Sequence, residues 1–457
     1  MINKKILACI MAVIMLLSAV SVFAAPESNG ETEQNSDAQP AEETIVANSP
    51  HVLLLDMNTG MVIYEKGAKE KVYPSSLTSI MTALLVLENC NLEELVTASE
   101  SAISSVPAGD NKVGIIKDEK LTIRQLLYGM LLSSASDAAN LLAEKTSGSI
   151  EEFVKLMNSR AKELGMNNTN FTNPTGSHDE RHYTTAEDMS ILARKAMENE
   201  TFREIVKSES YSIPATEKSP TARKITNRNH FVSSLLRKDY YYKNATGIKT
   251  GYSTAAKSCI AASAEKNGIS LLALVFEAET VDNVAQSFSD CKNMFDYVFS
   301  HYTTQKVVDK GEVIAQTNVE YTRSDNKLIL VSERKLSIIK PKTVESVEIT
   351  YKDNLKNTVS APVKKNQVVG EREYFMNGIS IGTVNLLADK NYNLDPVTYI
   401  VDKIVDFVTS PWLFVAIIAV IILFVMMERR RRRVLRKKRR DARKKRNSEL
   451  IKKMDDF

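Results

Sequence analysis

The sequence predicts an exported α+β protein in which helices pack on an antiparallel sheet, followed by a small all-β domain and a C-terminal transmembrane helix. Three observations carry this prediction. Helical periods and strand-like runs mix over residues 48–300, short alternating segments fill 303–394, and an uncharged apolar run at 411–427 precedes a cluster of arginines. A chain of 457 residues has room for two or three domains.

Residues 1–24 have the layout of a secretory signal peptide. Lys4 and Lys5 precede an apolar stretch that ends in small residues. The alternative is an uncleaved membrane helix, and under either interpretation the residues that follow are exported. Residues 25–47 are predicted to form a flexible acidic spacer, because they contain six acidic residues, no basic ones and few large apolar side chains.

The region 48–300 is predicted to be one domain. It begins with a hairpin between His51 and Tyr64, where two β-rich runs flank an Asn-Thr-Gly turn. Further on, helical periods cover 77–88, 123–143 and 151–164, and strands return at 260–276.

The region 303–394 is predicted to be a small all-β domain, because short alternating segments there are separated by turn residues. The predicted strands are 307–308, 313–321, 327–331, 344–351, 367–370 and 379–387. A helix over 396–408 then leads towards the membrane.

Residues 404–427 are predicted to be a single transmembrane helix, because 17 to 24 residues at about 1.5 Å per residue can cross the hydrocarbon core. The tail at 428–457 contains 16 basic and 5 acidic residues, so the positive-inside rule places it in the cytoplasm, close to anionic lipid. A nucleic-acid-binding tail is the alternative interpretation. The exported residues 25–427 carry a net charge of −9, which excludes a nucleic-acid-binding body.

No metal or organic cofactor is predicted. The four cysteines include no CxxC pair, and the five histidines are scattered. His178 and His182 are four residues apart, but they lie in a stretch with Gly and Pro where a helical pair of ligands is not expected. Nothing in the sequence indicates an oligomeric state.

Three short motifs suggest chemistry. Ser76 lies at the start of a predicted helix, Ser134 and Ser136 stand in Leu-Leu-Ser-Ser-Ala-Ser-Asp, and Lys249-Thr250-Gly251 precedes a strand. Each motif alone is weak, because a serine at a helix start is usually an N-cap and Lys-Thr-Gly arises by chance.

Together, their order and context resemble the S-x-x-K, S-x-N and K-T-G motifs of the D-alanyl-D-alanine carboxypeptidase family, the low-molecular-mass penicillin-binding proteins. The segments 55–60, 173–176, 182–189 and 227–229 are also similar to that family. The resemblance spans 48–394. It implies that 48–300 forms a β-lactamase/transpeptidase-like domain, that a membrane attachment follows the small β-domain, and that the protein acts in peptidoglycan (cell wall) metabolism.

The resemblance also implies residue roles. Ser76 would attack the peptide bond between the terminal D-alanines of a stem peptide, and Ser134 would relay protons. Lys249 would supply positive charge, and the strand with Thr250 and Gly251 would pair with the substrate backbone. The oxyanion would lie between the backbone N–H of Ser76 and one on that strand.

The sequence departs from the family pattern at several positions. Ser79 stands where the family's lysine base is expected, and Ser136 stands where its asparagine holds the substrate amide. No Lys or Arg occurs from 269 to 291, where the family usually places the arginine that receives the substrate carboxylate. Lys257 stands at a position that is usually glycine.

Three functional hypotheses follow. The first is a degenerate enzyme that binds stem peptides or wall proteins, with Ser76 retained as a helix N-cap. The alternative is an active serine carboxypeptidase that removes the terminal D-Ala from pentapeptide stems, with Lys249 as substitute base. A β-lactamase-like hydrolase is a third, weaker hypothesis, because nothing in the sequence marks a deacylating carboxylate.

Overall fold

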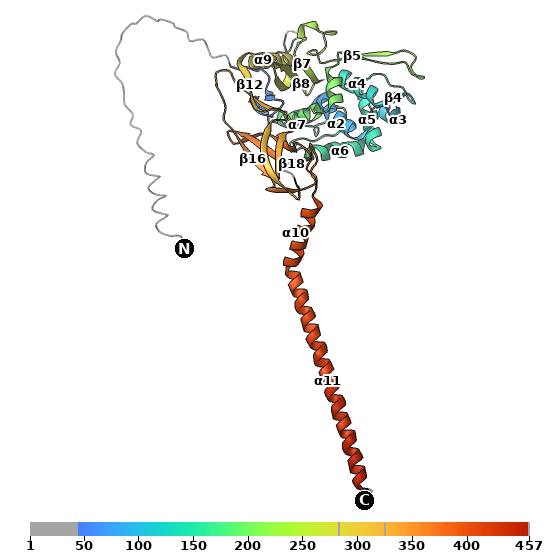
Figure 1. Cartoon of the computed structure of the whole chain (residues 1–457). Helices are drawn as coiled ribbons and strands as arrows, with labels where there is room; N and C mark the ends of the chain where they lie inside the picture. Colours follow the sequence, from blue (N-terminus) through green and yellow to red (C-terminus); the bar gives the residue numbers. More distant parts are fainter. Residues whose placement is uncertain (1–43, 282–283, 324–325, 456–457) are drawn as a thin grey trace, which may run out of the picture. The chain divides into compact units, whose positions relative to one another are not determined.

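The computed structural model describes residues 44–281, 284–323 and 326–455, and within them it describes side chains as far as residue 450 except at 284 and 449. The predicted signal peptide at 1–24 and nearly all of the spacer at 25–47 lie outside these residues. The described part contains a mixed α+β region, an all-β region and two C-terminal helices in chain order (Figure 1). The predicted fold class is therefore confirmed.

A five-stranded antiparallel sheet is the centre of the first domain, with the strand order β2-β1-β9-β8-β7. Its strands are β1 (His51–Asp56), β2 (Val62–Lys66), β7 (Ala245–Ser253), β8 (Lys257–Lys266) and β9 (Ile269–Ala278). The β1–β2 hairpin was predicted. The predicted strand region 260–276 is an antiparallel pair, β8 and β9, with Asn267 and Gly268 between them, both at positive φ. Because β7 is at the edge, one side of it remains open for another partner.

Helices cover both faces of this sheet. They are η1 (Ser75–Thr78), α2 (Ser79–Asn89), α3 (Glu100–Ser104), α4 (Ile123–Ser133), α5 (Ser136–Ser147), α6 (Ile150–Glu163), α7 (Ala186–Met197), α8 (Glu200–Lys207), η2 (Lys238–Tyr240) and α9 (Gln286–His301). Three short strand pairs accompany them: β3 (Leu95–Thr97) with β4 (Lys120–Thr122), β5 (Ser210–Ile213) with β6 (Arg223–Thr226), and β10 (Thr280–Val281) with β11 (Val284–Ala285).

Strand β1 shows how the sheet separates two cores. Leu53 and Leu55 join the larger core with α2, α4, α5, α6 and α7, whereas Val52 and Leu54 pack on the side of α9. Successive side chains of a strand point to opposite faces, so a fully apolar strand is buried on both. The whole strand is buried accordingly.

The predicted helical period over 123–143 is two helices. Helix α4 ends at Ser133, Ser134 has left-handed backbone angles (φ 58°, ψ 39°), and α5 begins at Ser136. The left-handed residue turns the chain, because it cannot continue a right-handed helix. Periodicity did not reveal the break, since both helices bury apolar side chains in the same core.

The second domain is all β, as predicted. Its strands are β12 (Tyr302–Val308), β13 (Val313–Glu320), β14 (Lys327–Ser332), β15 (Leu336–Pro341), β16 (Ile349–Leu355), β17 (Thr358–Ser360), β18 (Val368–Met376) and β19 (Ile379–Ala388). Six of them form one sheet in the order β16-β18-β19-β14-β13-β17, and β12 pairs with β15. The sequence prediction missed β15 and β17, and β17 is only three residues long.

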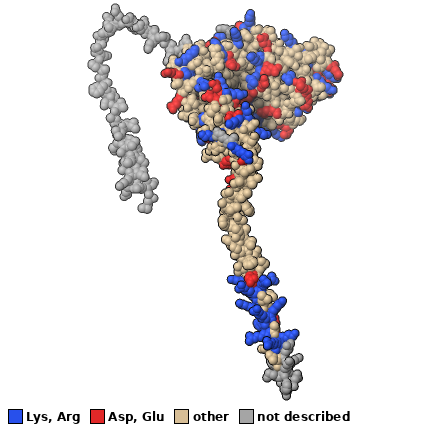
Figure 2. All heavy atoms as spheres, in the orientation of Figure 1, with Lys and Arg blue, Asp and Glu red and all other residues tan. Residues whose placement is uncertain are grey.

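The C-terminal segment is not one helix from 404 to 427, as the sequence prediction had it. Helix α10 (Pro396–Thr409) ends before Ser410, and α11 (Pro411–Asp455) starts anew. Ser410 is extended (ψ 128°), because a residue before proline avoids the helical conformation. Among the described helices, α11 is the one long and apolar enough to cross a membrane, and its uncharged band precedes the basic tail in Figure 2.

Candidate active site

Ser76 lies in η1, at the point where the chain enters α2. Its neighbours Ser75, Leu77 and Thr78 are buried, whereas Ser76 itself is partly exposed. Ser75 has a positive φ of 47°, which is a strained conformation for a non-glycine residue and sets the direction in which the next side chain points. Neither η1 nor α2 has a side-chain cap, and their cap positions are Pro74 and Thr78. The expected role of Ser76 as an N-cap was therefore wrong.

Ser79 occupies the position of the missing lysine, one turn after Ser76. It is 2% exposed, and its hydroxyl donates a hydrogen bond of 2.7 Å to the carbonyl oxygen of Ser76. A serine near the start of a helix can satisfy its hydroxyl group by donating to a carbonyl oxygen of the preceding turn. A hydroxyl does not accept a proton near neutral pH, so this position supplies no base.

Ser134 and Lys249 are brought together from two distant motifs. The Lys249 amine donates to Ser134 Oγ at 2.5 Å and to the carbonyl of Thr250 at 2.8 Å. The left-handed conformation of Ser134 presents its side chain at the turn between α4 and α5. The fold therefore brings these two sequence-predicted residues together, Ser134 from the turn between α4 and α5 and Lys249 from the edge strand β7.

The Lys249 side chain is almost completely buried, with 1% exposure. Burial, and then the positive charge of Arg228, lower the pKa of Lys249 to about 7. A buried ammonium loses its hydration, so the neutral amine becomes competitive near neutral pH. Lys249 can therefore serve as a proton acceptor at this site.

Gly251 lets β7 approach η1. A Cβ built at Gly251 would lie 3.2 Å from the backbone nitrogen of Ser76 and 3.1 Å from Leu77 Cδ1. The N–H of Ser76 therefore lies directly against the strand, with the partly exposed Thr250 beside it. The role of Ser76 and β7 in binding an oxyanion stays a prediction from the family resemblance.

Ser136 is bound to another residue of the site. It is 5% exposed, and its hydroxyl donates to Asp110 Oδ2 at 2.8 Å. Ser177 donates to the same oxygen at 2.5 Å. Neither Asp110 nor Ser177 was predicted as a site residue from the sequence. They come from two separate loops outside the three motifs, between α3 and β4 and between α6 and α7.

His182 contacts η1, the helical turn that contains Ser76. The backbone N–H of Thr172 donates to Nδ1 at 3.2 Å, so the proton is on Nε2, which faces Thr78 Oγ1 at 2.9 Å. Burial lowers the pKa of His182 to about 4, which keeps the ring neutral. The described residues contain no group of three His, Cys, Asp or Glu side chains that could hold a metal ion.

The end of β9 carries negative charge where the resemblance implies an arginine. Glu277 has a positive φ of 54°, and Glu279 forms an ion pair of 2.5 Å with Lys257. Lys257 also has a positive φ, 51°, which explains why glycine suits this position. Lys257 is therefore already paired with Glu279.

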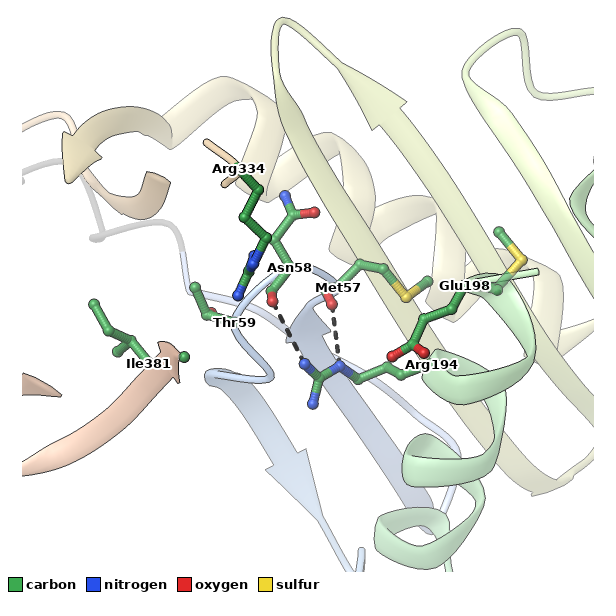
Figure 3. Close-up of a pocket in the computed structure, with 9 residues that line it drawn as sticks. Met57, Asn58, Thr59, Arg194, Glu198, Arg334 and Ile381 are labelled. Carbon is green, nitrogen blue, oxygen red and sulfur yellow. Dashed lines mark hydrogen bonds between the residues drawn. The ribbon is translucent and has the colours of Figure 1, made fainter. Parts of the chain in front are cut away.

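A separate cavity of about 520 Å³ is lined by a different set of residues (Figure 3). Its lining includes the Met57–Thr59 turn, Arg194, Glu198 and Arg334. Arg194 Nε donates to the carbonyl of Met57 at 3.0 Å and thereby braces the turn. None of the sequence-predicted site residues lines this cavity.

The comparisons with known proteins match these features. The profile of the D-alanyl-D-alanine carboxypeptidase family matches residues 34–280, and that of the C-terminal domain of penicillin-binding protein 5 matches 302–393. The chain belongs to the D-alanyl-D-alanine carboxypeptidase family. The family boundaries agree with the two domains of the fold.

Relatives of this carboxypeptidase family span both domains. The chain is 32% identical to D-alanyl-D-alanine carboxypeptidase DacF of Bacillus subtilis, over 80% of this chain and 89% of that protein. Penicillin-binding protein 5 from Haemophilus influenzae is 26% identical with a TM-score of 0.57, over 77% of this chain and all of that one. A structure of PBP3 from Streptococcus pneumoniae has a TM-score of 0.64 at 23% identity, which shows the shared fold.

Proposed function

We propose that this protein is a catalytically silent member of the carboxypeptidase family that binds peptidoglycan stem peptides at the outer face of a bacterial cell membrane. One observation carries the proposal. The hydroxyl at Ser79, where the resemblance implies a lysine, is turned back onto the carbonyl of Ser76. A serine nucleophile is weak without an adjacent base, and removing such a base from a catalytic unit costs on the order of 10⁶-fold in rate.

The rest of the site supports binding without turnover. Among the described residues, no hydrogen bond joins a basic side chain to the hydroxyl of Ser76. Ser136, in place of the asparagine, is bound to Asp110. The open edge of β7 is retained, so a peptide backbone can still pair with the strand next to Gly251.

A second candidate function is slow D-alanyl-D-alanine carboxypeptidase activity, and the Lys249–Ser134 contact favours it. With a pKa of about 7, the amine accepts a proton from Ser134, which could in turn accept one from Ser76. The proton of Ser76 would thus reach Lys249 through the hydroxyl of Ser134, instead of moving directly to a lysine at position 79.

Covalent labelling with a reporter penicillin separates the two candidates, because acylation uses the same nucleophile and base. The full-length protein in detergent is compared with Ser76→Ala, Lys249→Met and Ser79→Lys. The proposal expects no labelling of the wild type and a gain of labelling in Ser79→Lys. Wild-type labelling that disappears in both Ser76→Ala and Lys249→Met would establish the active enzyme instead.

The membrane attachment is part of the proposal. Helix α11 supplies an uncharged apolar segment over 411–427, and the basic residues after it favour a cytoplasmic tail. Helix α10 contacts the β-domain through its polar side, where Tyr321 donates a hydrogen bond to Asp402 at 2.8 Å. Labelling of intact cells with a thiol reagent that does not cross the membrane tests this orientation. Lys310→Cys should be labelled from outside, and Ser448→Cys should not. Outside labelling of Ser448→Cys would contradict it.

A further inference from the structure

We propose that Asp110 determines the specificity of this site, by selecting ligands that present an ammonium or N–H group to it and disfavouring ligands that present a carboxylate there. The proposal rests on the proposed function, because it concerns how the same site recognises a stem peptide. Asp110 belongs to none of the three motifs.

Two hydroxyl groups hold the carboxylate of Asp110 in place. Ser136 donates to Oδ2 at 2.8 Å and Ser177 donates to the same oxygen at 2.5 Å. Each hydroxyl has one proton to donate, so both protons are used on Asp110. Both hydrogen bonds end on one oxygen, so they fix the orientation of the Asp110 carboxyl group.

The loop that carries Asp110 is anchored to the start of α5. The carbonyl of Asn111 accepts a hydrogen bond from the backbone N–H of Ser136 at 2.8 Å. The buried carboxylate of Asp137 accepts the backbone N–H groups of three further loop residues, Val113, Gly114 and Ile115. The segment that follows Asp110 is therefore tied to the start of α5.

These segments also border the nucleophile and the buried lysine. Ser177 follows Gly176, which packs so closely on Ser75 that a Cβ there would lie 1.9 Å from its carbonyl oxygen. Ser136 is two residues after Ser134, the hydrogen-bond partner of Lys249. Asp110 therefore bridges two segments near Ser76: the start of α5, through Ser136, and the turn after Gly176, through Ser177.

The remaining oxygen, Oδ1, accepts no hydrogen bond from the described residues. A carboxylate accepts and never donates when ionised, so a ligand at this oxygen must supply the proton. No described Lys or Arg side chain forms an ion pair with Asp110, so its charge would repel a ligand carboxylate. Ser136 adds no donor, because its proton already points to Asp110.

Two synthetic stem pentapeptides with acetylated N-termini provide the test. They differ only at a lysine in the third position, which has a free amine in one peptide and an acetylated amine in the other. Binding to the full-length protein in detergent is measured at pH 7 for the wild type, for Asp110→Asn and for Asp118→Asn. Asp118 lies in the same loop, is exposed and has a positive φ of 62°, which asparagine tolerates.

The wild type should bind the peptide with the free amine about three- to fivefold more tightly, which is the upper range for a partly exposed ion pair. Asp110→Asn should bind both peptides equally, since it keeps the shape and loses the charge, whereas Asp118→Asn should keep the preference. Equal binding by the wild type, or an unchanged preference in Asp110→Asn, overturns the role of Asp110 alone. Binding of neither peptide by any variant overturns the proposed function together with it.

Discussion

The amine of Lys249 donates a hydrogen bond of 2.5 Å to Ser134, although 115 residues separate the two in the chain. The contact depends on the left-handed turn at Ser134 and on the buried position of Lys249 in the edge strand. Burial lowers the pKa of this amine to about 7, so near neutral pH its neutral and protonated forms are both populated. The function of the protein depends on whether that amine can act in place of the one absent at position 79.

Lys249 should make stability rise with pH above neutrality. Its pKa is about 7 in the folded protein against a usual value of 10.5, so between these pH values the unfolded chain binds more protons. The folded state therefore gains stability as the pH rises from about 7 to about 10, by on the order of 5 kcal/mol at most. Urea unfolding at pH 7, 8 and 9 should show this rise in the wild type. Lys249→Met should flatten the curve, and an equal slope in both proteins would refute the buried amine.

His182 should make the protein sensitive to mild acid. Its pKa is about 4 in the fold and 6.5 when free, so the unfolded chain takes up a proton first as the pH falls. Stability should drop by about 3 kcal/mol between pH 6.5 and pH 4. His182→Gln should lose part of this drop in thermal unfolding across the same range. The exposed His178, changed to Gln, is the control and should keep the wild-type profile.

Gly176 and Gly148 should respond differently to alanine. Both have nearly the same backbone, with φ of 83° and 82°, but a Cβ at Gly176 would lie 1.9 Å from Ser75 O, whereas at Gly148 it would meet nothing within 4 Å. Gly148→Ala should cost about 1 kcal/mol, from the left-handed conformation alone. Gly176→Ala should cost at least about 3 kcal/mol, since the turn must move away from η1. Denaturant unfolding of both variants checks this, and similar losses would show that the turn is not packed as described.

The ion pair of Glu119 with Arg223 should be a strong stability determinant. Glu119 is fully buried and receives two hydrogen bonds from the guanidinium, at 3.2 and 2.5 Å. Burial raises the pKa of Glu119, but hydrogen bonds from Thr216 and Arg223 outweigh it and hold the pKa below its usual value. Arg223→Met should cost about 3–5 kcal/mol, because a buried charge loses its partner.

An exposed pair serves as the control for this prediction. Lys155 and Glu152 are one helical turn apart on α6 and both largely exposed. Lys155→Met should change stability by no more than about 0.5 kcal/mol. A small loss in Arg223→Met, comparable to that of the control, would show that Glu119 does not depend on its guanidinium partner.

Much of the fold was accessible from local patterns. The β1–β2 hairpin was predicted because its turn residues and flanking β-branched side chains are neighbours in the chain. The break at Ser134 was missed, because a single residue with left-handed backbone angles leaves the hydrophobic period on either side intact. The break at Ser410 was missed too, since apolar residues continue on both sides of Pro411.

By itself, the sequence determined the domain order, the apolar segment near the C-terminus, the three motifs and the serine at position 79. Each of these depends on residue identity or on spacing along the chain. Only the tertiary structure decided that Ser79 donates to the carbonyl of Ser76, that Lys249 is buried against Ser134, and that Ser136 donates to Asp110. The contacts of Lys249 and Asp110 join residues that are far apart in the chain, and the lowered pKa of Lys249 results from its burial. A local sequence pattern predicts neither spatial proximity nor desolvation.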